Sequence, residues 1–470
     1  MSGLFTTLNA TVQALNAQSV GLNITGKNLA NVNNAAYSRE TVLLGNGPSV
    51  QTPQGPQSTG LQVLGIDQVR DALLDQQVTR EIALTSSYTT QQGILQNAQA
   101  GLGQNISNTT AASGTGSNAG TGGLAAAVDD FFNAFQGLAA SPTDAGEKQT
   151  LVQKAGILAD TFQQTDSRLA QVQSDATAQI QSDVASVNQM LQTVADLNKQ
   201  ISSVEIGKPN SALDLRDQRQ SVLEQLAQKL PVSTQPGANG AVDVVMKDAS
   251  NNNVVLVSGA NVTGPVTFTG TGLTAGSPAT AVQFSSGSIY GALTARDGAV
   301  QDLRNSLDAM AQQIVTSVNA AYAPTGANFF DPAGTTASTI ALDGGLSAST
   351  LQAGTGAAGD NSVALAVAAI SDHAFSTSGA PADAIDGTIS QYFSGAVSQF
   401  GQALASANTL VDNQTSVANL VKSQRDQVSG VSMDEEMANL VRYQTAYQAS
   451  ARVFSIVNDL LGTVINNLGA

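Results

Sequence analysis

The chain has 470 residues, of which 35 are acidic and 19 are basic, so its formal net charge is −16. This negative surplus argues against nucleic acid and anionic membranes as partners, because both would repel the chain. Cysteine is absent, which excludes disulfides, thiolate metal sites and cysteine nucleophiles. Only 11% of the residues are charged, so amides and hydroxyls supply most of the polar surface.

The start of the chain lacks the features of a cleavable secretory signal. Residues 1–36 contain one charged side chain, Lys27, and no continuous apolar run behind a basic start. The longest apolar run elsewhere, 363–370, is far shorter than the roughly 18 residues of a membrane helix. We therefore expect a protein that is soluble or is exported by a route that reads another feature.

Residues 1–35 have the spacing of a helix with an apolar seam, because large apolar side chains recur every seven residues with others between them. The seam residues at this end are Phe5, Leu8, Val12, Leu15, Leu22 and Leu29. The helix ends in the stretch NLANVNNAAYSRE at 28–40. Its asparagines offer side-chain hydrogen bonds that compete with the helix, and they tolerate left-handed turns. We expect a corner here, with Tyr37 and Arg39 anchoring it against the body or a neighbouring molecule.

The middle of the chain changes character several times. In chain order we expect an extended connection at 36–62, a helical body made of 63–231, 289–323 and 361–432, a β domain inserted at 232–288, and an irregular insertion at 324–360.

The last segment, 433–470, is again a helix with a heptad seam. Its seam residues are Met433, Met437, Leu440, Tyr447, Phe454, Leu461, Ile465 and Leu468. Ser432 and Glu435 have the spacing of a capping box at its start. The predicted fold is mainly α with an inserted β domain: the terminal heptad helices pair as a coiled coil, long helices form a bundle body, and the β module faces outward.

The sequence offers little chemistry. Gly114, Gly116 and Ala119 match a loose nucleotide-binding pattern, but no strand precedes them. His373 is the only histidine, and one histidine makes neither a triad nor a facial metal site. The acidic pairs Asp129/Asp130 and Asp214/Asp217 fall in predicted helices, where solvated faces are the default. We therefore expect no catalytic, cofactor or metal site, and no enzyme.

Assembly is a better explanation of the two terminal seams than an intramolecular hairpin alone. Around Leu8 and Leu15 the other face of the helix carries threonine, asparagine, alanine, glutamine and serine, with almost no charge. Identical copies packed side by side repeat their own charges, so like charges would repel, whereas amides and hydroxyls can pair with themselves. We expect the terminal helices to mediate self-assembly.

The 28–40 stretch resembles the N-terminal signature of the flagellar rod, hook and hook-associated axial proteins, N-I-A-N-x-N-T-x-G-Y-x-R-Q. The matching residues are Asn28, Ala30, Asn31, Asn33, Tyr37 and Arg39, and the departures are Asn34, Ala36 and Glu40. The stretch SGVSMDEEMANLVRYQTAYQASARVFSIVNDLLGTVINNL at 429–468 resembles the C-terminal signature of the flagellar hook-associated protein 1 family. Internal pieces such as ALDLRDQRQSVLEQLAQKL at 212–230 are similar to the same family.

This resemblance implies a structural protein of the flagellum, exported through the flagellum's own channel and therefore without a cleavable signal. It implies an extracellular ring at the hook–filament junction, between the hook protein and the second junction protein, hook-associated protein 3. It also implies a cytoplasmic export chaperone on the C-terminal helix and terminal helices that line the tube. The alternatives are a hook or distal-rod protein and, from another class, a secreted acidic hydrolase.

Overall fold

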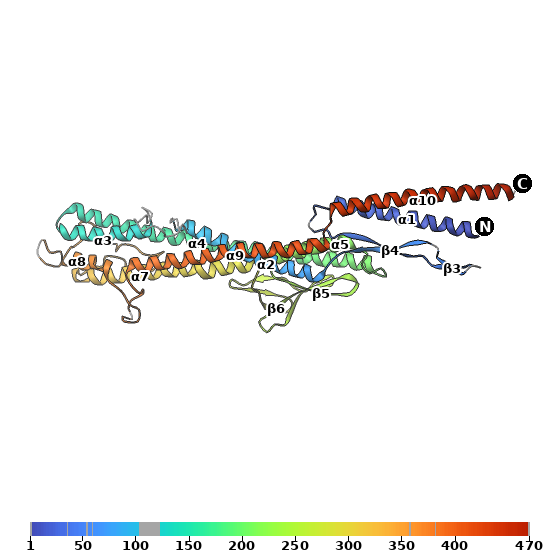
Figure 1. Cartoon of the computed structure of the whole chain (residues 1–470). Helices are drawn as coiled ribbons and strands as arrows, with labels where there is room; N and C mark the ends of the chain where they lie inside the picture. Colours follow the sequence, from blue (N-terminus) through green and yellow to red (C-terminus); the bar gives the residue numbers. More distant parts are fainter. Residues whose placement is uncertain are drawn as a thin grey trace.

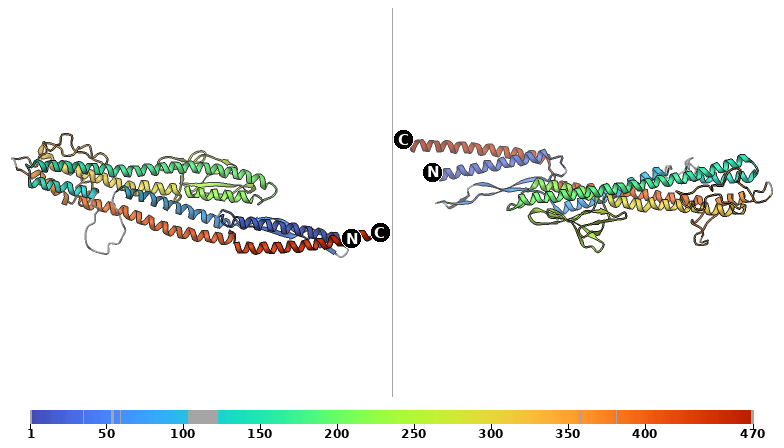
Figure 2. Two further views of the ribbon diagram at one scale, coloured as in Figure 1. Left: turned by 90° about the horizontal axis from the view of Figure 1, so that it is seen from above. Right: turned by 180° about the vertical axis from the view of Figure 1, so that it is seen from behind.

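The computed structural model describes residues 2–34, 36–52, 55–58, 60–102, 123–356, 359–380 and 382–468. The molecule is elongated, with both chain ends side by side at one end, a long helical body, and a β module on one flank of the body (Figure 1). Views from above and behind show the terminal helices continuing the long axis of the body (Figure 2). Gly114, Gly116 and Ala119 lie outside the described residues.

The terminal helix pair consists of α1 (Ser2–Ala30) and α10 (Met433–Leu468), which run antiparallel along each other. Two antiparallel ladders follow α1: β1 (Glu40–Asn46) pairs with β4 (Leu61–Gln68), and β2 (Ser49–Thr52) pairs with β3 (Gly55–Ser58). The sequence predicted helical spacing from residue 63, and this was wrong. Pairing with β1 keeps the chain extended to Gln68, and α2 starts only where Asp71 caps the backbone N–H groups of Leu73 and Leu74.

The helical body is formed by the remaining α-helices, of which α6 and α8 are short. They are α2 (Ala72–Gly101), α3 (Leu124–Ala140), α4 (Ala145–Glu205), α5 (Leu213–Lys229), α6 (Ser288–Ala295), α7 (Gln301–Tyr322), α8 (Ser362–Ala368) and α9 (Ile389–Ser429). Short turns of helix, η1 (Ala238–Gly240), η2 (Arg296–Val300), η3 (Ala323–Thr325) and η4 (Ala369–Asp372), lie between or beside them. The helix α4 is long enough to run through most of the body, where α3, α5 and α7 pack against it at different heights.

The distal end of the body, away from the chain termini, has an aromatic core. Five rings that are at most 1% exposed pack mostly edge to face, with ring centroids 5.0–5.8 Å apart. They are Phe131, Phe135, Tyr322, Phe329 and Phe330. The described part of the predicted irregular insertion, 324–356 and 359–360, has little regular structure. It is nevertheless fixed to the body, because Phe329 and Phe330 insert into this core.

The sequence predicted a helix from residue 361 almost to the end, which the structure corrects. After α8 and η4 the described residues 373–380 and 382–388 are not helical, and an isolated bridge pairs Phe375 with Gly387. The next helix, α9, begins at a full capping box between Thr388 and Gln391.

The β module is an antiparallel sheet in the order β8-β7-β6-β11-β10-β9, with β5 also paired to β6. Its strands are β5 (Ser233–Pro236), β6 (Val242–Asp248), β7 (Asn253–Ser258), β8 (Asn261–Val262), β9 (Thr267–Phe268), β10 (Leu273–Ala275) and β11 (Thr280–Gln283). Two asparagines of α4 fasten it to the body. Asn188 exchanges two hydrogen bonds with the backbone of Val266 (2.8 and 2.9 Å), and Asn198 does the same with Val242 (2.7 and 3.2 Å). The predicted fold class, mainly α with an inserted β domain, is confirmed.

Candidate functional site: the terminal helix pair and its corner

The face of α1 that lies against α10 is built from small side chains. Ala17 and Gly21 occupy it, with Ile24 and Asn28 nearer the corner, and all four are buried. A Cβ atom placed on Gly21 would lie only 2.6 Å from the ring of Tyr443 on α10. The two helices therefore approach closely at Gly21, because a glycine leaves no side chain between the backbone of α1 and the Tyr443 ring.

Only some of the predicted seam residues are buried in the contact between α1 and α10 of the same chain. On α10, Leu461 is buried and Leu440 and Phe454 are half-buried. A second row of buried or half-buried residues lies one position before the predicted seam residues Met437 and Ile465. It consists of Glu436, Tyr443, Ser450, Val457 and Val464. The reason is that Glu436 and Tyr443, which no apolar pattern selects, face α1 at the corner and at Gly21.

The remaining seam residues point elsewhere. Four of those on α10 are exposed, and two on α1 are also exposed, with Phe5 half accessible to solvent at 50%. The exposed seam residues are Phe5, Val12, Met433, Met437, Tyr447 and Ile465. Leu8, Leu15, Leu22 and Leu29 are half-buried, and the side chain of Leu468 lies outside the described part.

The outer face of α10 carries further large apolar side chains that the sequence pattern did not single out. They are Val441, Val453, Ile456 and Leu460, each between 44% and 59% exposed. A helix that is apolar on more than one face is usually buried on more than one face. Such exposed apolar surfaces are over-represented at interaction sites.

Asn28 organises the corner after α1. Its side chain is 1% exposed, and its Oδ1 accepts hydrogen bonds from Tyr37 Oη (2.7 Å) and the Glu40 backbone N–H (3.0 Å). Its Nδ2 donates to the Glu40 carbonyl oxygen (2.8 Å) and to Glu436 Oε2 (3.2 Å). Only an amide offers two donors and an acceptor in this geometry, so Asn28 joins α1, the connection and α10 through one buried side chain.

Arg39 attaches the start of α10 to the corner. Its Nε donates to Glu436 Oε1 and its Nη1 to Glu435 Oε2, both at 2.8 Å, and its backbone N–H donates to the carbonyl oxygen of Ser429 (2.9 Å). The sequence left open whether Arg39 anchors the body or a neighbour, and these contacts are all within the chain. Within the predicted capping box, the backbone N–H of Glu435 donates to Ser432 Oγ at 3.5 Å, while the Glu435 carboxylate pairs with Arg39.

Lys27 and Tyr37 complete the charge arrangement. Lys27 Nζ lies 2.6 Å from Glu40 Oε1 and 2.7 Å from Asp214 Oδ1. Burial lowers the pKa of Lys27, but the two carboxylates outweigh it and hold this pKa above its ordinary value. Burial, with the nearby charge of Glu40, raises the pKa of Tyr37. Tyr37 therefore stays a neutral hydrogen-bond donor.

The other signature residues lie at the surface of the same corner. Asn31 Nδ2 donates to the carbonyl oxygen of Lys27 (3.0 Å), which satisfies a backbone group at the end of α1. Ala30 and Asn33 are exposed. Sequence reasoning missed Lys27, Glu40 and Glu436, because isolated charges at unlinked positions give no pattern.

The acidic pairs differ from one another. Asp129 and Asp130 are exposed, as expected for a solvated helix face. Asp214 pairs with Lys27, and Asp217 is 6% exposed and lies 3.2 Å from Arg70 Nη2. The expectation of a solvated face is therefore wrong for Asp217. Burial raises the pKa of Asp217 to about 6 against the opposing charge of Arg70.

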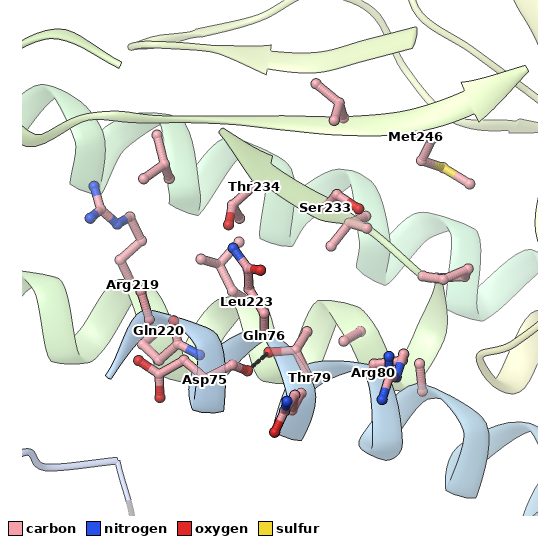
Figure 3. Close-up of a pocket in the computed structure, with 18 of the residues that line it drawn as sticks. Asp75, Gln76, Thr79, Arg80, Arg219, Gln220, Leu223, Ser233, Thr234 and Met246 are labelled. Atoms are coloured by element: carbon pink, nitrogen blue, oxygen red, sulfur yellow. Dashed lines mark hydrogen bonds between the residues drawn. The ribbon is translucent and has the colours of Figure 1, made fainter. Parts of the chain in front are cut away.

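A cavity of about 1730 Å³ lies between α2, α5 and the β module (Figure 3). Among its lining residues within the described ranges, the carboxylates are Asp67 and Asp75. Asp75 faces Arg70 at 3.2 Å, and Thr79 bonds to its backbone carbonyl (Figure 3). This arrangement is an ion pair in a cleft and not a pair of carboxylates poised for hydrolysis.

Histidine and metal chemistry have no assembled site in the part of the chain that the structure covers. His373 is exposed at the end of η4, and no group of three potential metal ligands occurs among the described residues. Within the same ranges, no helix has both the length and the apolar character needed to span a bilayer.

Comparison with known proteins gives consistent matches. Residues 114–330 match the flagellar hook-associated protein FlgK helical domain, and residues 422–468 match the flagellar basal body rod FlgEFG protein C-terminal domain. The chain is 27% identical over its whole length to flagellar hook-associated protein 1 of Bacillus subtilis (strain 168), covering 99% of that protein. The protein of the same name from Escherichia coli (strain K12) is 26% identical over 54% of this chain and 42% of its own length. The solved structure of the flagellar hook junction protein FlgK from Burkholderia pseudomallei aligns with a TM-score of 0.45 and 21% identity, over 55% of this chain and 46% of that one.

Proposed function

The chain belongs to the flagellar hook-associated protein 1 family, and we propose that it is a structural component of the bacterial flagellum that joins the hook to the filament. In this role the chain has no catalytic activity and acts outside the cell, where its geometry is its function. The terminal helix pair supplies contacts between copies, and the body presents one side to the hook and the other to the next junction protein.

The observation that supports this proposal is the apolar outer face of the terminal helix pair. Residues such as Phe5, Ile456 and Leu460 are 50–59% exposed although each is large and apolar. Burying one such side chain against a neighbour contributes about 1.5 to 3 kcal/mol. Several of them per subunit would favour contact between copies, against the cost in lost freedom that every association carries.

The charge distribution favours packing among identical copies. Lys27 is the only charged residue of α1, and it is already paired with Glu40 and Asp214 in the same chain. At the start of α10, Glu435 and Glu436 pair with Arg39, while Asp434 is exposed. The rest of α10 carries three further exposed charges of both signs, Arg442, Arg452 and Asp459, so neighbouring copies in a ring would meet mainly through apolar and neutral polar side chains, with few repeated like charges.

The expected partners follow from this position. The ring would contact the hook protein on one side and hook-associated protein 3 on the other. Before export through the flagellar apparatus, the exposed apolar face of α10 requires cover, and a cytoplasmic chaperone bound to this helix would provide it.

Deleting the gene tests the position in the flagellum. We expect hooks to persist while filament subunits are shed into the medium, because the filament loses its foundation. Loss of the hooks themselves would instead indicate a hook or rod protein. Hooks that still carry filaments would contradict the proposal.

A pair of variants tests the terminal surface. In the deletion strain, Ile456→Gln with Leu460→Gln should fail to restore filaments, while the purified monomer keeps its helical circular dichroism. The matched control is Ile157→Gln with Leu365→Gln, two similarly exposed apolar side chains on the body, which should restore them. Full restoration by the α10 variant would remove the terminal surface from the proposal.

A further inference from the structure

The first two turns of α5 contact α1, the corner that follows it, and the segment between β4 and α2. Asp214 pairs with Lys27 of α1 (2.7 Å). Asp217 Oδ2 accepts a hydrogen bond from the backbone N–H of Ser38 in the corner (3.3 Å), and its Oδ1 lies 3.2 Å from Nη2 of Arg70, between β4 and α2. Arg70 in turn donates from Nε to Ser38 Oγ (3.1 Å). These contacts fix α5 to the corner from which the terminal pair extends.

The same two turns hold the β module. Arg219 Nη1 donates to the Gly240 carbonyl oxygen (2.7 Å), just before β6, and to Asn198 Oδ1 (2.9 Å) on α4. Figure 3 shows Arg219 rising from α5 toward the strands. Asn198 is the residue that also bonds to the Val242 backbone. Arg219 therefore links α5 to both the β module and the asparagine that holds this module in place.

A fourth contact ties the segment to the end of α4. Arg216 forms a two-pronged pair with Glu205, with distances of 2.8 Å (Nε to Oε1) and 2.7 Å (Nη2 to Oε2). The Glu205 side chain is 1% exposed. Two parallel hydrogen bonds between planar groups fix an angle as well as a distance.

Burying charged side chains contributes little net stability to a helix, because each charge loses its hydration. Asp217 and Arg219 are both less than 10% exposed, and apolar residues of similar volume often stabilise such positions equally well or better. What charged pairs supply in addition is direction, because each pair is satisfied in one relative orientation only. The six-residue stretch 214–219 contains four charged residues that each pair with another element, the buried Asp217 and Arg219, the partly exposed Arg216 and the exposed Asp214. This concentration points to orientation as the role of the stretch.

We propose that residues 214–219 are a positioning site that sets the orientation of the β module relative to the terminal helix pair. Asp214 and Asp217 act toward the terminal pair, and Arg216 and Arg219 act toward α4 and the β module. The benefit of this orientation rests on the proposed function, since every subunit of a ring would then present its β module at the same angle. The orientation itself is a property of a single chain and is tested without any assembly.

Spin labels on two engineered cysteines measure this orientation, and the chain has no cysteine of its own. Ala438 on α10 and Ala260 in the turn between β7 and β8 are both exposed and report the distance between the terminal pair and the module. A second label pair, Ala260 with the exposed Gln192 on α4, reports whether the module stays seated on the body.

Asp214→Ala combined with Asp217→Asn should broaden the Ala438–Ala260 distance distribution by about twofold, as at a loosened hinge. The Ala260–Gln192 distribution should stay narrow, and circular dichroism should stay unchanged. Arg219→Gln should broaden both distributions. The control Asp130→Ala removes the partner of Lys154 on an exposed surface and should change neither.

An unchanged Ala438–Ala260 distribution in the double variant would overturn the positioning role, whatever the fate of the flagellar assignment. Should the double variant lose helical content, Asp214→Glu and Asp214→Asn decide instead. The longer carboxylate should keep the narrow distribution and the neutral amide should broaden it, and equal widths for the two would overturn the proposal.

Discussion

The distal end of the body encloses its large rings, whereas the terminal helix pair leaves many of its large apolar side chains exposed. In the distal body, large rings such as Phe131 and Phe329 are fully enclosed. In the terminal pair, the small residues Ala17 and Gly21 are buried on α1 and Leu461 on α10, while large apolar side chains such as Ile456 are exposed. The distal body thus has an enclosed core within the single chain, whereas large apolar side chains of the terminal pair are exposed along much of its length, as the proposed contact between copies requires.

The sharpest way to break this comparison is to truncate one phenylalanine in each region. Phe329→Ala should lower the free energy of unfolding by about 3 to 5 kcal/mol, because it leaves a cavity among buried rings. Phe5→Ala, at a residue that is half exposed, should change it by less than about 0.5 kcal/mol. Urea denaturation of the two purified variants measures both. Equal losses would show that the terminal pair is packed like the body.

The corner should be the most sensitive part of the terminal region. Arg39→Ala leaves the Glu436 carboxylate, whose side chain is 2% exposed, with Asn28 as its remaining described hydrogen-bond partner. Removing one member of a buried pair costs about 3 kcal/mol, and the loss should appear as faster hydrogen exchange at the start of α10. The control is Glu435→Ala, where the carboxylate is 62% exposed and the expected cost is below about 1 kcal/mol. Protection that survives in Arg39→Ala would show that the corner is held by other contacts.

The joint between the regions should respond to pH through Asp217. Because burial raises its pKa to about 6, the folded state holds the proton more tightly than the unfolded state. The resulting stability is fully present below the ordinary carboxyl pKa and is lost as the pH rises through about 6. The free energy of unfolding should therefore rise by about 1 to 2 kcal/mol between pH 7.5 and pH 5.

Asp217→Asn isolates this contribution, since the amide does not titrate. Burial also raises the pKa of Asp75, which remains in the variant, so the comparison is between the two slopes over the same pH range. A variant with the same slope as the unaltered chain would show that Asp217 does not contribute to the pH dependence.

The smallest predicted effect is the loss of stability of α1 when a side chain is added where α1 and α10 approach closely. Helix propensity alone favours Gly21→Ala by about 0.5 to 1 kcal/mol. The added methyl group would meet the Tyr443 ring, and such overpacking costs about 1 to 3 kcal/mol. Net destabilisation of α1, measured by hydrogen exchange, is expected, together with its relief by Tyr443→Ala. A stabilised α1 in Gly21→Ala alone would indicate that the helices are not in contact there.

Much of the fold could be predicted from the sequence because it follows from repeating local patterns. Heptad spacing identified both terminal helices, period-two alternation identified the inserted β module, and the asparagine-rich stretch identified the corner after α1. Asn28 and Arg39 were found because they belong to a compact motif. The start of α2 was misplaced, because the alternation of β4 acquires meaning only from its pairing with β1, which precedes it by some twenty residues.

The sequence by itself determined most of the helices, the inserted β module and the low charge of the N-terminal helix, because periodicity and charge are properties of neighbouring residues. Only the tertiary structure decided which face of α10 meets α1. It alone brought Lys27, Asp217 and Glu436 to one joint, and it alone buried Asp217, which the sequence placed on a solvated face. Such contacts depend on the geometry between elements distant in the chain, and no local spacing encodes that geometry.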